Sequence, residues 1–140
     1  MKKNINIILL IIVSLFLVSC NEKEETYKDF ENKHLTATNA FKQGSDDYYL
    51  YIYKVNCPYC EQVKDLIFKQ AKDKETPLYF INELDVTDVL KRTDEPNYNN
   101  YDARSLSEVK INGVPTLLLI SKSRVIDQFV GASQISQELG

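Results

Sequence analysis

The sequence is poor in residues that bind metal ions: its 140 residues include three cysteines and a single histidine. Cys57 and Cys60 have the Cys-x-x-Cys spacing that forms half of many zinc sites. A complete site would have to add His34 and a carboxylate, a combination that we disfavour. We therefore expect no metal centre and no cofactor, and we expect His34 to face solvent from a helix.

An excess of positive charge is also missing. The chain has 17 Lys and Arg against 20 Asp and Glu, which gives a formal net charge of −3. Proteins that bind nucleic acids carry a basic patch or stripe, so we expect no nucleic-acid partner. The sequence has no internal repeat and no low-complexity tract, and its length suits one small domain with its own core.

A hydrophobic run long enough to span a bilayer is the third absence. The longest apolar stretch covers residues 5–18 and follows a basic start with Lys2 and Lys3. As a helix it would be about 21 Å long, whereas the hydrocarbon core of a membrane is about 30 Å thick. This pattern is typical of a secretory signal peptide, and a permanent transmembrane helix is the weaker alternative.

The segment Leu17-Val18-Ser19-Cys20 resembles the bacterial lipobox. The resemblance implies a lipoprotein signal peptide over residues 1–20 that ends at Cys20, with lipid attached to that cysteine. Lipid chains would hold the protein on the extracytoplasmic face of a bacterial membrane. The alternative is a cysteine that merely ends a signal peptide. We predict a polar tether over residues 21–25 and a folded domain over residues 26–140.

The folded domain is predicted to be one α/β unit. The run YYLYIYKV is rich in aromatic and β-branched residues, which is typical of a buried strand. We predict strands over 48–55, 78–81, 116–120 and 125–130, the last two forming an antiparallel hairpin. We predict helices from Pro58 onward, within 27–42, and over 86–92, 105–108 and 133–139. Together they indicate a mixed central sheet with helices on both faces.

The two cysteines of the domain follow its first strand and begin its main helix. Free backbone N–H groups and the positive end of the helix dipole stabilise a thiolate at such a place, which Cys57 occupies. Cys60 lies one turn further along and is expected to be more buried. These positions indicate that Cys57 forms a mixed disulfide with a partner and Cys60 resolves it. A structural disulfide is the alternative, although so small a loop restrains little unfolded-state entropy.

A second motif, Gly113-Val114-Pro115-Thr116, stands just before the hairpin. Together with the apolar strand after it and Val130-Gly131-Ala132, it resembles the C-terminal half of the thioredoxin superfamily, and the resemblance covers residues 48–139. It implies a thioredoxin-like fold in which a cis Val114–Pro115 bond faces the cysteines and the Val114 backbone binds an extended substrate. Pro58 and Tyr59, the dipeptide typical of glutaredoxins, complete the expected substrate site.

Two positions depart from the thioredoxin pattern. Thioredoxins usually have a tryptophan before the first cysteine, whereas this chain has Asn56 there and contains no tryptophan. The buried acid six residues before that cysteine is replaced by Tyr51. In the family this acid assists proton transfer at the resolving cysteine. The features that remain resemble thioredoxin-like lipoproteins of Gram-positive bacteria, including bacteriocin transport accessory proteins.

These patterns predict a membrane-anchored thiol–disulfide oxidoreductase. Its expected partners are thiols and disulfides of exported proteins and a membrane electron donor or acceptor, and we expect a monomer. The direction of electron flow stays open. The alternative is a non-catalytic binding protein for an exported peptide such as a bacteriocin. The segment 93–102 is interpreted as a surface loop, with partner recognition as the alternative.

Overall fold

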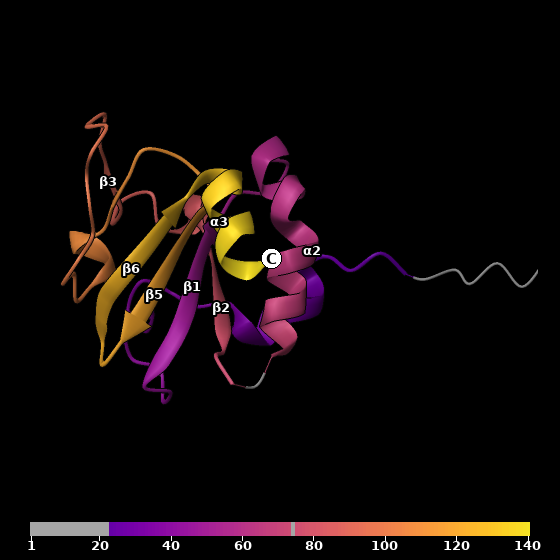
Figure 1. The fold of residues 1–140 in the computed structure, drawn as a ribbon. Coiled ribbons are helices and arrows are strands. Elements are labelled where there is room, and N and C mark those ends of the chain that lie inside the picture. Colours follow the sequence, from indigo (N-terminus) through magenta and orange to yellow (C-terminus); the bar gives the residue numbers. More distant parts are fainter. Residues whose placement is uncertain (1–22, 74) are drawn as a thin grey trace, which may run out of the picture.

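A four-stranded mixed sheet forms the centre of the computed structural model, which describes residues 23–73 and 75–140 (Figure 1). The strand order is β2-β1-β5-β6. Strand β1 is parallel to β2 and antiparallel to β5, and β5 and β6 form an antiparallel hairpin. The strands are β1 (Asp47–Tyr53), β2 (Leu78–Asn82), β5 (Thr116–Ser121) and β6 (Arg124–Val130). The predicted α/β class and the hairpin are confirmed.

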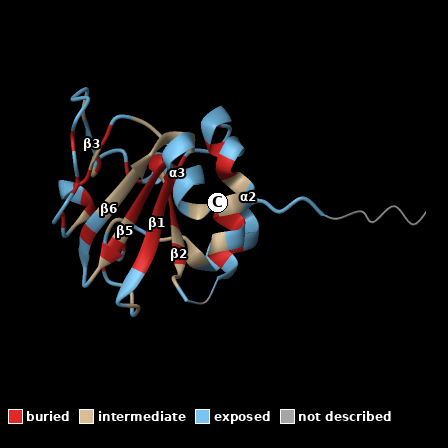
Figure 2. Cartoon of the chain, in the orientation of Figure 1, coloured by how far each residue is buried: buried red, intermediate tan, exposed pale blue. Residues whose placement is uncertain are grey.

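Two α-helices pack against one face of this sheet, α2 (Pro58–Lys72) and α3 (Gly131–Leu139). Pro58 is the first residue of α2, where its missing N–H removes no helical hydrogen bond. Val63, Ile67 and Ala71 recur at helical spacing and are fully buried. Figure 2 shows this inner side of α2 as buried and its outer side as exposed. The short 3-10 helix η1 (Tyr27–Lys33) joins the same layer through Phe30.

The opposite face of the sheet is covered mainly by residues 83–111. This segment holds the 3-10 turns η2 (Glu83–Asp85) and η3 (Leu106–Glu108). Its apolar side chains pack on Tyr48, Leu50 and Ile52 of β1. Every residue of β1 except Asp47 is buried, because the strand has a hydrophobic layer on each side.

The helix predicted over residues 86–92 is wrong. Val86 and Leu90 do turn into the core, but Lys91 N–H donates to the Val109 carbonyl at 3.1 Å and Thr93 N–H to the Ile111 carbonyl at 3.0 Å. These bonds make an extended pair, β3 (Lys91–Arg92) with β4 (Lys110–Ile111), in parallel. Residues 86–90 form one local turn, with Leu90 N–H bonded to the Val86 carbonyl, and from Lys91 onward pairing with a distant segment replaces local helical hydrogen bonds.

The helix predicted over residues 105–108 shortens to the 3-10 turn η3. Ser105 is the N-cap residue of η3, but its side chain makes no capping bond. The Glu108 carboxylate instead accepts a hydrogen bond from Arg104 N–H at 2.7 Å. Only one 3-10 turn results.

The prediction that His34 faces solvent from a helix is also wrong. His34 lies just after η1 and pairs with Phe80 of β2 as an isolated bridge. Its Nε2 is 2.7 Å from the Tyr53 hydroxyl and its Nδ1 is 3.0 Å from the Phe30 carbonyl. The ring thus ties η1 to the sheet. In residues 23–73 and 75–140, no three potential ligands among His, Cys, Asp and Glu cluster to hold a metal ion.

The predicted signal peptide and the lipidation of Cys20 lie outside the described residues. The described part of the predicted tether runs along α2: Glu24 pairs with Lys64 and Glu25 with Lys72, each at 2.7 Å. Within the described part of the chain, no helix combines the length and the apolar character that a membrane span requires.

Candidate active site

Both cysteines of the CPYC motif lie where β1 passes into α2. Asn56 has a left-handed backbone with φ of 60°, a conformation that asparagine tolerates better than most side chains. This residue turns the chain so that Cys57 becomes the N-cap of α2. Asparagine therefore has a local backbone reason to stand where thioredoxins usually have tryptophan.

The two thiols are free, adjacent and unequal in exposure. Cys60 N–H donates to Cys57 Sγ at 3.3 Å. Cys57 is 9% exposed, whereas Cys60 is fully buried. A sulfur at the N-cap receives a hydrogen bond from the helix and lies at the positive end of its dipole, so negative charge on Cys57 is stabilised there. The outer cysteine is the one that a partner can approach.

The Gly-Val-Pro-Thr segment faces Cys57. The Val114–Pro115 peptide bond is cis, as the family resemblance implies. The Cys57 thiol donates to the Val114 carbonyl at a distance of 3.8 Å. Gly131, with φ of 78° in a region that favours glycine, donates its N–H to the Pro115 carbonyl at 2.9 Å. Segments more than fifty residues apart in the sequence therefore meet at one place.

An open groove of about 420 Å³ runs beside this meeting point. Val114 and Pro115 line it together with Tyr59, whose side chain is largely exposed. Pro58, the other residue predicted to bind substrate, is exposed at the start of α2 but does not line the groove. The groove also includes the first residues of α3. It has the dimensions and the free surface to accept a segment of another polypeptide.

Burial controls the chemistry of Cys60. Removal from water and, to a smaller extent, hydrogen bonding with Cys57 raise the pKa of its thiol to about 12. The Lys54 backbone and the neighbouring Tyr51 hydroxyl act in the opposite direction on this pKa. Cys60 is therefore a protonated thiol at neutral pH when the pair is reduced.

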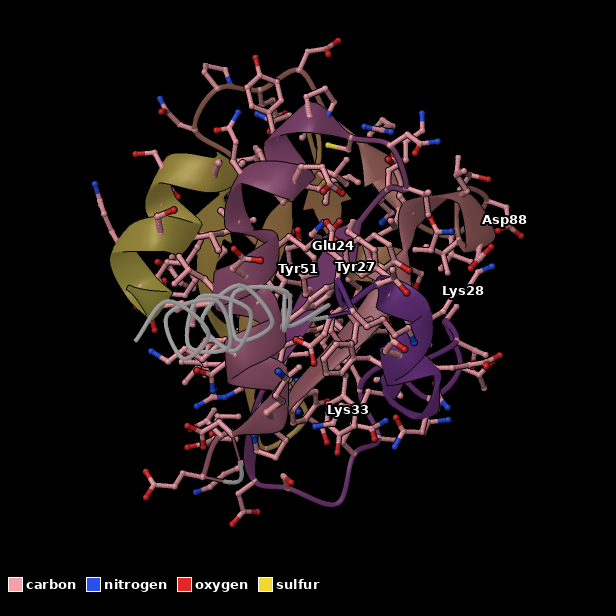
Figure 3. All side chains as sticks on the ribbon, turned by 90° about the vertical axis from the view of Figure 1, so that its right-hand side faces the viewer. Glu24, Tyr27, Lys28, Lys33, Tyr51 and Asp88 are labelled. Carbon is pink, nitrogen blue, oxygen red and sulfur yellow. The ribbon has the colours of Figure 1, made fainter. Side chains whose placement is uncertain are left out.

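Tyr51 and Tyr27 lie beside Cys60, and Figure 3 labels both tyrosines. Tyr51 is fully buried, and burial raises the pKa of its hydroxyl far above the ordinary value. Tyr27 reaches the same place from η1, with its ring stacked on Tyr53 at a centroid distance of 3.9 Å. The sequence indicated Tyr51 as the residue in place of an acid. It gave no signal for Tyr27, which is distant in sequence and belongs to no motif.

The tyrosine-rich segment 93–102 is held to the body of the domain. Asn100 is buried and exchanges two hydrogen bonds with the Lys110 backbone, at 2.9 and 2.7 Å. Gln128 donates to the Tyr98 carbonyl at 3.0 Å. Of the two tyrosines in the segment, Tyr98 is buried and Tyr101 is exposed. The amide side chains here fix the loop against β4 and β6.

Comparison with solved structures finds the same fold in proteins of low sequence identity. A mutant thioredoxin from Halobacterium salinarum is 14% identical with a TM-score of 0.53, and the match covers 75% of this chain and 81% of that one. Oxidised mitochondrial thioredoxin 3 from Saccharomyces cerevisiae is 15% identical with a TM-score of 0.53, over 76% and 89%. These similarities concern the fold.

Comparison with curated protein sequences finds no match. The family model described as a thioredoxin-like domain matches residues 35–138, which include both cysteines and the cis proline. Such a domain suggests thiol–disulfide redox chemistry in general. The predicted thioredoxin-like fold is thereby confirmed, and the chain belongs to the thioredoxin-like domain family.

Proposed function

We propose that this protein is an extracytoplasmic thiol–disulfide oxidoreductase that exchanges disulfides with exported proteins through Cys57 and Cys60. The observation that carries the proposal is the position of Cys57 Sγ at the start of α2, 3.3 Å from Cys60 N–H and 3.8 Å from the Val114 carbonyl. This arrangement supports a reactive sulfur, a second thiol behind it and a backbone edge for the partner.

In the proposed reaction, the Cys57 thiolate attacks a disulfide of the partner. A Cys57–partner disulfide forms, and the other partner sulfur leaves with the bonding electron pair. Cys60 then attacks Cys57 Sγ, the internal disulfide closes, and the second partner sulfur leaves. The partner chain lies in the groove beside Val114, where extended backbone pairing accepts many sequences.

Location and type of protein belong to the same proposal. A signal peptide ending at Cys20, with lipid on that cysteine, would place the domain on the outer face of a bacterial membrane. This arrangement resembles Gram-positive thioredoxin-like lipoproteins. It also accounts for the third cysteine, because lipidation leaves Cys57 and Cys60 as the only thiols.

The decisive experiment is trapping of mixed disulfides. The Cys60→Ser variant of the full chain is expressed in a bacterial envelope, thiols are blocked with acid and alkylating reagent, and adducts are separated on non-reducing gels. We expect partner adducts that disappear on reduction, because a serine hydroxyl is unable to resolve them. The matched control is Cys57→Ser, which should form none. If Cys60→Ser forms no more adducts than Cys57→Ser, the exchange reaction is excluded.

A non-catalytic binding protein for an exported peptide is the second candidate. The replacement of the family's buried acid by Tyr51 favours it, because that acid assists proton transfer in the family. Peptide binding that persists unchanged in a Cys57→Ser/Cys60→Ser double variant, with no adducts in the trapping experiment, would select this candidate.

A further inference from the structure

Two tyrosine hydroxyls beside the cysteines are buried without a hydrogen-bond partner. Among residues 23–73 and 75–140, the Tyr27 and Tyr51 hydroxyls have none, although both oxygens are shielded from solvent. Nearly all buried polar groups in proteins are hydrogen-bonded, because an unpaired hydroxyl loses its interaction with water without replacement. Two such groups at one place call for a physical reason.

The aromatic packing holds these hydroxyls in position. The Tyr51 ring is parallel to the Tyr53 ring, with a centroid distance of 5.9 Å and an interplanar angle of 2°. Tyr27 stacks on Tyr53 and meets Phe68 edge-to-face, with an interplanar angle of 81°. Tyr51 also belongs to the central strand β1, whose backbone is paired on both edges. The hydroxyl of Tyr51 therefore stays next to Cys60 and cannot turn toward water.

Negative charge on Cys60 needs a donor at this place. During resolution the buried sulfur carries charge while it attacks Cys57, and an uncompensated buried charge is costly. In the mixed disulfide Cys57 is no longer ionisable, so its opposing effect on Cys60 ends. The remaining neighbours that favour the Cys60 thiolate are the Lys54 backbone and the Tyr51 hydroxyl.

We propose that the Tyr51 hydroxyl donates a hydrogen bond to Cys60 Sγ when that sulfur becomes negative, and that the Tyr27 hydroxyl donates in turn to the Tyr51 oxygen. Tyr51 is thus a catalytic residue of the resolving step, and Tyr27 is a positioning residue that acts through it. The inference rests on the exchange reaction proposed above. The Tyr51 hydroxyl thus stands where the family has a buried carboxylate. It acts as a hydrogen-bond donor and not as a base.

The step balances without any change in the tyrosines. The Cys60 electron pair forms the Cys60–Cys57 bond, the Cys57–partner bond breaks, and its electron pair leaves with the partner sulfur. The proton of the Cys60 thiol ends on the partner thiol, and the partner disulfide is the oxidant. Charged acceptors form the stronger hydrogen bond, so Tyr51 is attracted to the sulfur only while it carries charge. Two linked donors also reinforce each other.

The test separates the two chemical steps. The reduced full-length protein in detergent, carrying Cys20→Ser so that two thiols remain, is mixed with excess 5,5′-dithiobis(2-nitrobenzoate) in a stopped-flow instrument. Attack by Cys57 releases the first coloured thiolate at a rate that depends on reagent concentration. Resolution by Cys60 releases the second at a rate independent of it. The rates are recorded across the neutral and mildly alkaline pH range.

We expect Tyr51→Phe to leave the first phase unchanged and to slow the second about tenfold, which corresponds to about 1.4 kcal/mol. Its pH profile for the second phase should move upward by about one unit. Tyr27→Phe should slow the second phase by less. The matched control is Tyr48→Phe on the same strand, whose hydroxyl is bonded to the Ala40 carbonyl away from the cysteines; it should change neither phase.

The inference would be overturned if Tyr51→Phe had the same second-phase rate and pH profile as the Cys20→Ser protein with Tyr51 intact. If Tyr51→Phe does not fold, an unchanged second phase in Tyr27→Phe would overturn the donor pair. If the exchange reaction proposed above is wrong, the result is different: the first phase is then absent in the Cys20→Ser protein with both tyrosines intact. That outcome removes the resolving step and with it the role of Tyr51.

Discussion

The two faces of strand β1 use the same type of residue in different ways. On one face, Tyr48 is buried and its hydroxyl donates to the Ala40 carbonyl at 2.9 Å. On the other, Tyr51 is equally buried beside Cys60, and its hydroxyl has no partner in the described chain. The first face satisfies its polar group within the native structure. The second keeps a donor available at the place where the proposed reaction produces charge.

This difference suggests that stability and reactivity are divided between the faces. The core around Leu50 contains buried apolar side chains from residues 40–125 and neither cysteine of the CPYC motif. The core around Tyr51 contains both cysteines together with five other aromatic residues and the inner side of α2. Substitutions on the two faces should therefore separate loss of stability from loss of exchange.

The largest effect on stability is expected from Leu50→Ala. Leu50 is fully buried, and removal of such a side chain typically costs about 2–5 kcal/mol because a cavity remains. Urea unfolding should show this loss, while the folded protein still reacts with a small disulfide. The control Cys57→Ala removes a small side chain and should lose all exchange at much lower cost in stability. Loss of exchange in folded Leu50→Ala would contradict the division.

A smaller effect should distinguish the two tyrosines. Tyr48→Phe leaves the Ala40 carbonyl without its donor and should lower the free energy of unfolding by about 1–2 kcal/mol. Tyr51→Phe removes a hydroxyl that has no partner, so stability should change by less than about 0.5 kcal/mol or rise. Thermal and urea unfolding of both variants in the reduced state measure the difference. Equal destabilisation would indicate that the Tyr51 hydroxyl is already bonded in the native state.

The last effect is a dependence of stability on alkaline pH in the reduced form. Burial raises the pKa of Cys60 from 9.0 to about 12, so above pH 9 the unfolded chain releases a proton that the folded chain keeps. The folded state then binds more protons, and its stability must fall as pH rises through this window. The oxidised form has no such proton and serves as the control, since the buried tyrosines titrate in both forms. Equal slopes in the two forms would contradict the shift.

Much of the fold followed from local patterns. The run of tyrosines and aliphatic residues that became β1, and the apolar spacing that became α2, predicted these elements because a buried strand and an amphipathic helix each have a characteristic period. The pair β3 and β4 was not predictable in this way. Each strand has only two residues, and its hydrogen bonds come from a segment about twenty residues away. His34 was misplaced for the same reason, because it bonds to Tyr53 of β1 and pairs with Phe80 of β2.

The sequence by itself determined the chemical components of the candidate site: two cysteines one helical turn apart, a proline before a strand, and a tyrosine where the family has an acid. Spacing along one helix is a local property, so it can be read without the fold. The order along the helix also indicated that Cys60 is the more buried cysteine, and the family resemblance implied that Val114 and Pro115 face the pair. Only the tertiary structure decided the 3.8 Å approach of Cys57 to the Val114 carbonyl and that Tyr27 joins Tyr51 beside Cys60. Burial and proximity between distant segments arise when the sheet and its covering layers pack together, and no local pattern specifies them.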